Sequence, residues 1–255
     1  MNIFRNLFSL SVFLFLFSNC LQSKELEKIE VILLIDSKSN LNKSVVHDEK
    51  VMISTLQKIA IRAQMELKTT IYKGNSVTQE NIKKWLKSLQ GSSHDVVLFY
   101  FSGHGCKDTT PFVPWPKLFF SARSMFFSMK TVIKAIEETK TRLSLIVSDC
   151  CNGPLSSKPF CLPLQSKVPL PFRTKKGNLG AQALFKKARG HIRAVAASPG
   201  QNALAFDRGS VFTLALSQSL SEELAKTTPS WERVFQSTKT RCGTIQTPYI
   251  SLDLQ

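Results

Sequence analysis

The sequence contains few cysteines and few acidic residues for its length. Six cysteines among 255 residues are too few for a disulfide-rich scaffold. Eleven glycines and eleven prolines exclude a collagen-like or low-complexity chain. Acidic residues number 18 against 34 lysines and arginines, and the resulting charge of +16 attracts polyanions or anionic lipid but indicates no fold. Because 43% of the residues are hydrophobic, the chain is globular, with one large domain or two smaller ones.

Long hydrophobic runs are also missing after residue 23, so no later segment is predicted to span a membrane. The first 23 residues predict a leader, because Arg5 precedes an apolar stretch at 7–17 that is short for a spanning helix. Residues 16–20, which end in Cys20, resemble the bacterial lipobox, and this resemblance implies lipidation of Cys20. Plain cleavage and retention as an anchor are the alternatives. We therefore expect an exported protein, either a membrane-attached lipoprotein or a periplasmic or secreted one.

Two hydrophobic patterns alternate along the rest of the chain. Apolar, β-branched runs predict strands at 29–35, 67–72, 95–101, 143–147, 192–197 and 247–252. Helical spacing predicts helices at 48–64, 78–91, 129–140 and 210–224, and a last one that begins near Thr228. Strands that alternate with helices of this length form parallel βαβ units. We expect one α/β domain over 26–255, with a mostly parallel sheet of six strands and helices on both faces.

Residues 154–190 show no hydrophobic period and predict a loop that links a first part, 26–153, to a second part, 191–255. The segment between Asp149 and Asp207 contains no acidic residue and nine lysines and arginines. This basic linker would attract phosphate, so a nucleic-acid binder is one alternative. We predict no nucleic-acid partner, because the sequence shows no helix-turn-helix, RNP or zinc-finger pattern and the linker's aromatic residues do not form a stacking platform.

A histidine and a pair of cysteines directly follow two of the predicted strands. VVLFYF runs into Ser102-Gly103-His104-Gly105, and LSLIV runs into Ser148-Asp149-Cys150-Cys151. The carboxyl ends of parallel strands meet at one edge of a sheet, and ligands bind there. The flanking glycines allow a sharp turn and a close approach of the backbone. An imidazole can take the proton of a thiol that is otherwise little ionised at neutral pH, so the pattern predicts a base and a nucleophile.

Together these segments resemble the caspase and metacaspase branch of cysteine peptidases. SGHG is followed 47 residues later by DCC-x-G, close to the spacing of about 50 residues between the caspase histidine and cysteine. The later run RAVAASPGQNALAFDRGSVFTLAL adds to the resemblance. It implies a three-layer caspase-like fold and a polypeptide substrate. It further implies that His104 is the base, that Cys151 is the nucleophile, and that the amides of Gly105 and Cys151 form the oxyanion hole.

The resemblance to metacaspases also implies a substrate pocket. Asp149 and Asp48 match two acidic positions that line the pocket for the side chain before the cut, and Ser102 is a third candidate wall. Carboxylates there favour Arg or Lys. For Asp48 the alternative is a helix N-terminal acid that interacts with the helix dipole. Asn152-Gly153 replaces the His-Ser-Gly that usually follows the nucleophile in metacaspases.

In caspase-like peptidases the segment after the nucleophile strand is often cut during activation. Here it offers Lys175-Lys176, Lys186-Lys187 and Arg189 to an enzyme that prefers basic residues, which predicts a self-processed zymogen. The alternative is a solvated loop that only sets the net charge.

Other functions remain open. A caspase-like protein without peptidase activity, which acts by binding, is the main alternative. We predict no metal, because no C-x-x-C pair or second histidine accompanies Cys106, Cys150 and His104. Calcium activation occurs among metacaspases, but the sequence has no D-x-D-x-D-G loop and does not indicate a cofactor. Cys150 is predicted to be a packing residue, and the oligomeric state stays undetermined.

Overall fold

A computed structural model describes residues 26–90, 93–154 and 178–255. Its centre is a six-stranded sheet with the strand order β11-β8-β7-β3-β1-β2. The strands are β1 (Lys28–Ile35), β2 (Glu66–Lys73), β3 (Ser93–Ser102), β7 (Lys140–Asp149), β8 (Gly190–Val195) and β11 (Tyr249–Leu254). Neighbouring strands are parallel except at one edge, where β11 runs antiparallel to β8. The predicted mostly parallel sheet of six strands is confirmed.

The central strands are apolar on both faces because each face packs against helices. Successive residues of β1 point to opposite sides of the sheet. Val31 and Leu33 belong to one hydrophobic cluster, whereas Ile32 and Leu34 belong to the other. Continuous apolar runs are typical of strands buried in this way.

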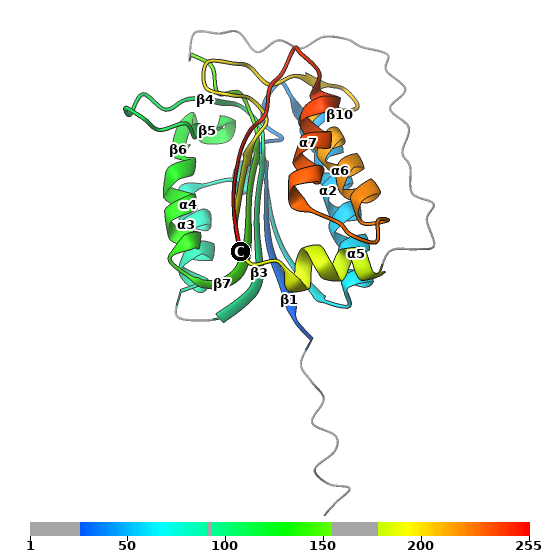
Figure 1. The fold of residues 1–255 in the computed structure, drawn as a ribbon. Helices are drawn as coiled ribbons and strands as arrows, with labels where there is room; N and C mark the ends of the chain where they lie inside the picture. The colour runs from blue at the N-terminus through cyan, green and yellow to red at the C-terminus, as the bar shows by residue number, and fades with distance from the viewer. Residues whose placement is uncertain (1–25, 91–92, 155–177) are drawn as a thin grey trace, which may run out of the picture.

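Helices cover both faces of the sheet, which confirms the three-layer prediction (Figure 1). One face carries α2 (Asn42–Ala63), α5 (Asn178–Gln182), α6 (Val211–Glu223) and α7 (Trp231–Cys242), and the other carries α3 (Gln79–Ser88) and α4 (Met129–Glu137). Thr78 caps α3, because its side chain accepts a hydrogen bond from the backbone N–H of Asn81. Helix α2 begins six residues before the predicted start at Asp48.

Several short elements were not predicted, because two to five residues are too few to show a hydrophobic period. An antiparallel three-stranded sheet follows His104 and consists of β4 (Gly105–Lys107), β5 (Pro116–Phe120) and β6 (Met125–Ser128). A small hairpin of β9 (Ala205–Phe206) and β10 (Gly209–Ser210) precedes α6. Two 3-10 turns, η1 (Gly74–Ser76) and η2 (Ser121–Arg123), complete the short elements.

The basic linker differs from the prediction at its carboxyl end. Residues 178–187 form α5 and the π-helical turn η3 (Ala183–Lys187) instead of a loop. Leu184 and Phe185 are buried, and the ring of Phe185 lies 5.2 Å from that of Trp231. Cleavage after Lys186 or Lys187 would therefore require this turn to unfold. Lys175 and Lys176 lie outside the described residues.

The predicted leader, residues 1–23 with Cys20, also lies outside the described residues. Within the described part of the chain, the helices are too short or too polar to cross a membrane.

Candidate active site

Three parallel strands end together at one edge of the sheet and bring the predicted residues to the same place. The register pairs Ile35 of β1 with Ser102 of β3, and Ser102 with Asp149 of β7. The pairing continues past the strands, because the backbone N–H of Gly103 donates to the carbonyl of Asp149 at 3.2 Å. His104 and Cys151 each follow two residues after the paired Ser102 and Asp149.

Gly105 shows how closely the two loops approach one another. A Cβ atom built on this glycine would lie 2.6 Å from Sγ of Cys150 and 2.8 Å from the carbonyl oxygen of Cys151. Any side chain here would clash with the loop that carries the thiols. Gly103 is equally confined, since a Cβ atom there would lie 2.6 Å from Cβ of Asp36. The glycines on both sides of His104 therefore let the histidine loop pack directly on the cysteine loop and on the loop after β1.

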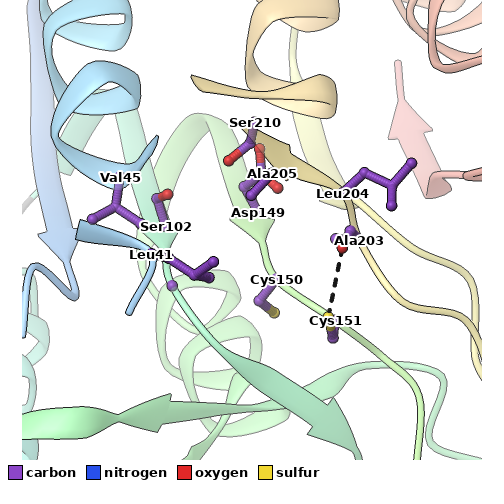
Figure 2. A pocket seen from close by; sticks show the side chains of 11 residues that line it. Leu41, Val45, Ser102, Asp149, Cys150, Cys151, Ala203, Leu204, Ala205 and Ser210 are labelled. Atoms are coloured by element: carbon purple, nitrogen blue, oxygen red, sulfur yellow. Dashed lines mark hydrogen bonds between the residues drawn. The ribbon is translucent and has the colours of Figure 1, made fainter. Parts of the chain in front are cut away.

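The two adjacent cysteines have opposite environments. Cys150 is 1% exposed and belongs to the hydrophobic cluster on the face of the sheet that α3 and α4 cover. Burial raises the pKa of the Cys150 thiol well above its usual value, so this thiol stays protonated and inert. Cys151 is half-buried, and its Sγ lies 3.8 Å from the carbonyl oxygen of Ala203 in the pocket drawn in Figure 2. Cys151 is therefore the accessible thiol, and Cys150 packs as predicted from the sequence.

His104 is half-buried and contacts a residue that the sequence did not single out. Its Nε2 lies 2.6 Å from Oδ1 of Asn40, in the loop between β1 and α2. Burial lowers the pKa of His104 below its ordinary value of 6.5, while the charge of Asp36 opposes that change. The imidazole is therefore mostly neutral at pH 7 and can accept a proton.

Asp36 and Asn40, which follow β1, were not predicted as site residues. Asp36 is fully buried, and its carboxylate accepts hydrogen bonds from the backbone N–H and the hydroxyl of Ser121, at 3.2 and 2.6 Å. The signal that was available is their place directly after a central parallel strand. That place marks the ligand edge of the sheet.

Asp48 and Ser102 lie together in the interior, and Ser102 but not Asp48 lines the pocket described below. The Oδ2 atom of Asp48 accepts hydrogen bonds from the hydroxyl of Ser102 at 2.8 Å and from the hydroxyl of Ser210 at 2.5 Å. Its Oδ1 accepts from the backbone N–H of Ser210 at 2.8 Å. The alternative interpretation of Asp48 as an acid in the first turn of its own helix is wrong, because α2 begins at Asn42. Asp48 instead faces the beginning of another helix, α6.

Asp149 meets the same end of α6. Its Oδ2 accepts hydrogen bonds from the backbone N–H of Thr213 at 2.9 Å and from the Thr213 hydroxyl at 2.6 Å. The hydroxyl of Tyr100 lies 2.6 Å from the same threonine oxygen. Both carboxylates are thus bound at the amino end of α6, where unpaired N–H groups and the helix dipole favour negative charge. Ser210 and Thr213 were not predicted as site residues.

The negative charges of Asp48 and Asp149 are unfavourable in this buried site. Burial raises the pKa of Asp149 to about 8, and the nearby charge of Asp48 adds to the rise. Burial likewise raises the pKa of Asp48, against the hydrogen bonds from Ser210 and Ser102 that lower it. Two acids that share one buried site resist full ionisation. A cation that entered the site would relieve this conflict.

A narrow pocket with a volume of about 20 Å³ connects Asp149 to the thiol of Cys151. Figure 2 shows Asp149 and Ser210 at one end and Cys151 at the other, with Ala203, Leu204 and Ala205 along one side. Leu41 and Val45 add apolar surface on the side of α2. The pocket thus has apolar walls and one acidic end, and its volume is close to that needed by a single water molecule.

Asn152 fixes the loop that carries Cys151. Its side chain is fully buried, and Nδ2 donates to the carbonyls of Pro114 at 2.8 Å and Ala197 at 3.3 Å. Its backbone N–H donates to the carbonyl of Gln201, and its own carbonyl accepts from the N–H of Gly200. The residue at which the sequence departs from the metacaspase pattern therefore anchors the loop that carries Cys151.

No group of three or more His, Cys, Asp or Glu side chains is arranged to hold a metal ion within the described ranges 26–90, 93–154 and 178–255.

Comparisons with known proteins agree with this arrangement. A family model described as "Caspase domain" matches residues 31–254. The structure resembles caspase-1 from Spodoptera frugiperda with a TM-score of 0.59 and 14% identity, over 89% of this chain and 87% of that one. A protein from Geobacter sulfurreducens is similar with a TM-score of 0.56 and 15% identity, over 88% of this chain and 92% of the other. At these identities the two structures show a shared fold only. A search of curated proteins found no match.

Proposed function

Since this chain belongs to the caspase domain family, whose function is of the cysteine peptidase type, we propose that it is an endopeptidase that uses Cys151 and His104 and cuts after Arg or Lys. One observation carries the proposal. Gly105 packs against both Cys150 and Cys151, so the histidine loop lies directly on the loop of the accessible thiol. A nucleophile and a base on adjacent loops, beside an acidic pocket, support peptide bond cleavage next to a basic residue.

In the first half of the proposed reaction, His104 takes the proton of the Cys151 thiol. The sulfur attacks the carbonyl carbon of the scissile bond, and the C–S bond forms as the carbonyl electrons move to the oxygen. The backbone N–H groups of Gly105 and Cys151 are proposed to stabilise that oxyanion. When the intermediate collapses, the C–N bond breaks, and the leaving amine takes the proton from His104. The product is a thioester on Cys151.

In the second half, water replaces the thiol. His104 removes a proton from the water, the resulting hydroxide attacks the thioester carbon, and the C–S bond breaks. The Cys151 sulfur leaves as a thiolate and recovers its proton from His104. A neutral histidine at the start of each half is needed, and burial of His104 supports this because it lowers the pKa of the imidazole.

The proposed preference for basic residues rests on Asp48 and Asp149. Both lie in the interior beside Ser102, and hydroxyl and backbone N–H groups hold them in place. A guanidinium or ammonium group near them would supply the missing positive charge. An acidic substrate residue would add a further negative charge to a buried site where two carboxylates already resist full ionisation, which is strongly unfavourable.

The test is a panel of fluorogenic peptides that differ only in the residue before the cut. We expect cleavage after Arg and Lys, with the Asp peptide cut at least about 100-fold more slowly. This ratio corresponds to a difference of about 2.7 kcal/mol. Cys151→Ala and His104→Ala should each lose cleavage by orders of magnitude, since the two groups act as a unit. Equal cleavage of the Asp and Arg peptides would contradict the specificity, and full activity in Cys151→Ala would contradict the mechanism.

We also propose self-processing in the basic linker. The packing of η3 reduces the number of positions at which the cut is expected. Lys186 lies 3.6 Å from Glu27 as an ion pair, and its turn packs through Leu184 and Phe185. Lys175-Lys176 is therefore the expected position of the cut. Incubation of the purified protein, with fragment ends mapped by mass spectrometry, should show a cut there that is absent in Cys151→Ala. An intact chain in an active enzyme would reject processing.

We also propose that residues 1–23 direct export. Metabolic labelling with an alkyne fatty acid distinguishes lipidation of Cys20 from plain cleavage of the leader. Label on the wild type that is lost in Cys20→Ser indicates lipidation, whereas an unlabelled chain that starts after the leader indicates plain cleavage.

A further inference from the structure

The loop between β1 and α2 presents a single amide side chain to the candidate base. Oδ1 of Asn40 lies 2.6 Å from Nε2 of His104, and the two residues are 64 positions apart in the chain. A carboxamide oxygen can only accept a hydrogen bond, so Nε2 must carry the hydrogen at this contact. A neutral imidazole has one protonated nitrogen and one lone pair. The lone pair is then on Nδ1.

We propose that Asn40 is a positioning residue for His104, which holds the neutral ring in the Nε2–H tautomer and leaves Nδ1 as the base for Cys151. This inference rests on the proposed function, because it assigns the atom that accepts the thiol proton. Which ring nitrogen is free to react is set by the hydrogen bond that the other one makes.

The loop is itself held in place, so Asn40 has a defined position. The Ser39 hydroxyl donates to the carbonyl of Asp36 at 2.8 Å and accepts from the N–H of Leu41 at 3.2 Å. The N–H of Ser39 also donates to the carbonyl of Asp36, and that of Asn42 donates to the carbonyl of Ser39. These bonds close a turn on either side of Asn40. The amide therefore meets the imidazole from a structured loop that is continuous with a central strand.

The chemical identity of the partner has a consequence for the pKa of His104. A carboxylate at this position would raise the pKa of the imidazole, and at neutral pH more of the base would be blocked by a proton. The amide of Asn40 gives orientation without that charge. Among the residues that the structure describes, the carboxylate whose charge acts on His104 is that of Asp36, whose oxygens accept hydrogen bonds from Ser121. Orientation and charge thus come from two different residues.

The hydrogen bond can persist through the reaction. When Nδ1 takes the proton from Cys151, the ring becomes an imidazolium and Nε2–H donates from a charged group. Such bonds are about twice as strong as neutral ones. Asn40 therefore supports the ring both before and after proton transfer, and no proton needs to move between Asn40 and His104.

The kinetic test uses three variants and an Arg peptide. Asn40→Ala should lower kcat about 100-fold with little change in KM, because a misplaced catalytic group costs rate without changing the substrate pocket. Asn40→Asp should recover much of the rate, since a carboxylate accepts the same bond, and should move the acid limb of the pH profile about one unit higher. Asn42→Ala is the matched control: the residue is exposed, lies two positions further on as the first residue of α2, and should behave as the wild type.

A second measurement tests the inference independently of cleavage. Nitrogen NMR of His104 in the intact protein, above the pKa of the ring, should show hydrogen on Nε2 in the wild type and in Asn42→Ala. In Asn40→Ala the two tautomers should mix. Hydrogen on Nδ1 in the wild type, or an unchanged tautomer in Asn40→Ala, would overturn the inference.

Wild-type kcat in a folded Asn40→Ala would overturn it as well. If the wild type cuts no peptide, the proposed function fails, and the NMR result alone decides the role of Asn40.

Discussion

The two sides of the candidate site are built in opposite ways. On the pocket side, Asp48 and Asp149 are at most 4% exposed, and each is bound by a backbone N–H and by hydroxyls at the amino end of α6. On the reactive side, His104 and Cys151 are only half-buried. Groups that recognise a charge gain from being fixed in a dry site, whereas groups that exchange protons must stay accessible to substrate and water.

The difference also appears in the pKa values. On the pocket side, burial raises the pKa values of both acids, so the folded protein keeps an unfavourable pair of carboxylates in place. Beside Cys151, burial lowers the pKa of His104 and favours its neutral form, as the proposed role of a base requires. The same physical effect, loss of hydration, disfavours an acid's charge in one place and preserves a neutral base in the other.

The largest expected effect separates Cys151 from its neighbour. Iodoacetamide should alkylate Cys151 at least about 100-fold faster than Cys150, because the reactive form is the thiolate and burial keeps Cys150 protonated. Tandem mass spectrometry of the peptide that contains both residues measures the two rates. Cys150→Ala should retain the fast reaction, and Cys151→Ala should lose it. Rapid modification of Cys150 in the folded protein would show that the two environments are misassigned.

A smaller effect is expected when the charge of the pocket is removed. Asp149→Asn should lower kcat/KM for an Arg peptide about 100-fold, or about 2.7 kcal/mol, because a buried partner of the substrate cation is lost. The asparagine can still accept the bond from Thr213. Asp207→Asn is the control, since this aspartate is exposed in the turn before α6 and pairs only at the surface with Lys43. Equal losses in both variants would indicate a general charge effect and not a pocket.

Asn152 holds the loop that carries Cys151 in place. Asn152→Ala should lower the free energy of unfolding by about 2 kcal/mol, because the carbonyls of Pro114 and Ala197 lose their donor in a buried place. Denaturant unfolding measures the change. The exposed Asn42→Ala should change it by less than about 0.5 kcal/mol. A neutral result for Asn152→Ala would mean that water or backbone shifts replace the lost bonds.

The smallest effect concerns pH. A general base works when it is unprotonated, so the lowered pKa of His104 should place the acid limb of kcat below pH 6.5, measured at saturating Arg peptide so that Asp149 is paired with the substrate cation. Asp36→Asn should move the limb lower still, by less than about one unit, because the charge that raises the pKa of His104 is gone. A limb well above pH 6.5 in the wild type, or an upward shift in Asp36→Asn, would refute this electrostatic account.

Much of the fold could be predicted because its patterns are local. The apolar runs of β1, β3 and β7 are continuous, and the helices between them repeat at helical spacing. Parallel order then places the residues after those strands at one edge, which is how His104 and Cys151 were found. The short elements were missed, as was the packed segment 178–187, because a few residues do not show a period.

The sequence by itself determined the order of the longer strands and helices along the chain and the glycines that admit a close approach, and it predicted His104 and Cys151 as the reactive pair. Only the tertiary structure decided their partners. Asn40 meets His104 across 64 residues, and Asp48 meets Ser210 across 162. Such contacts depend on how distant loops pack against one another, and hydrophobic period and turn composition report only on neighbours in the chain.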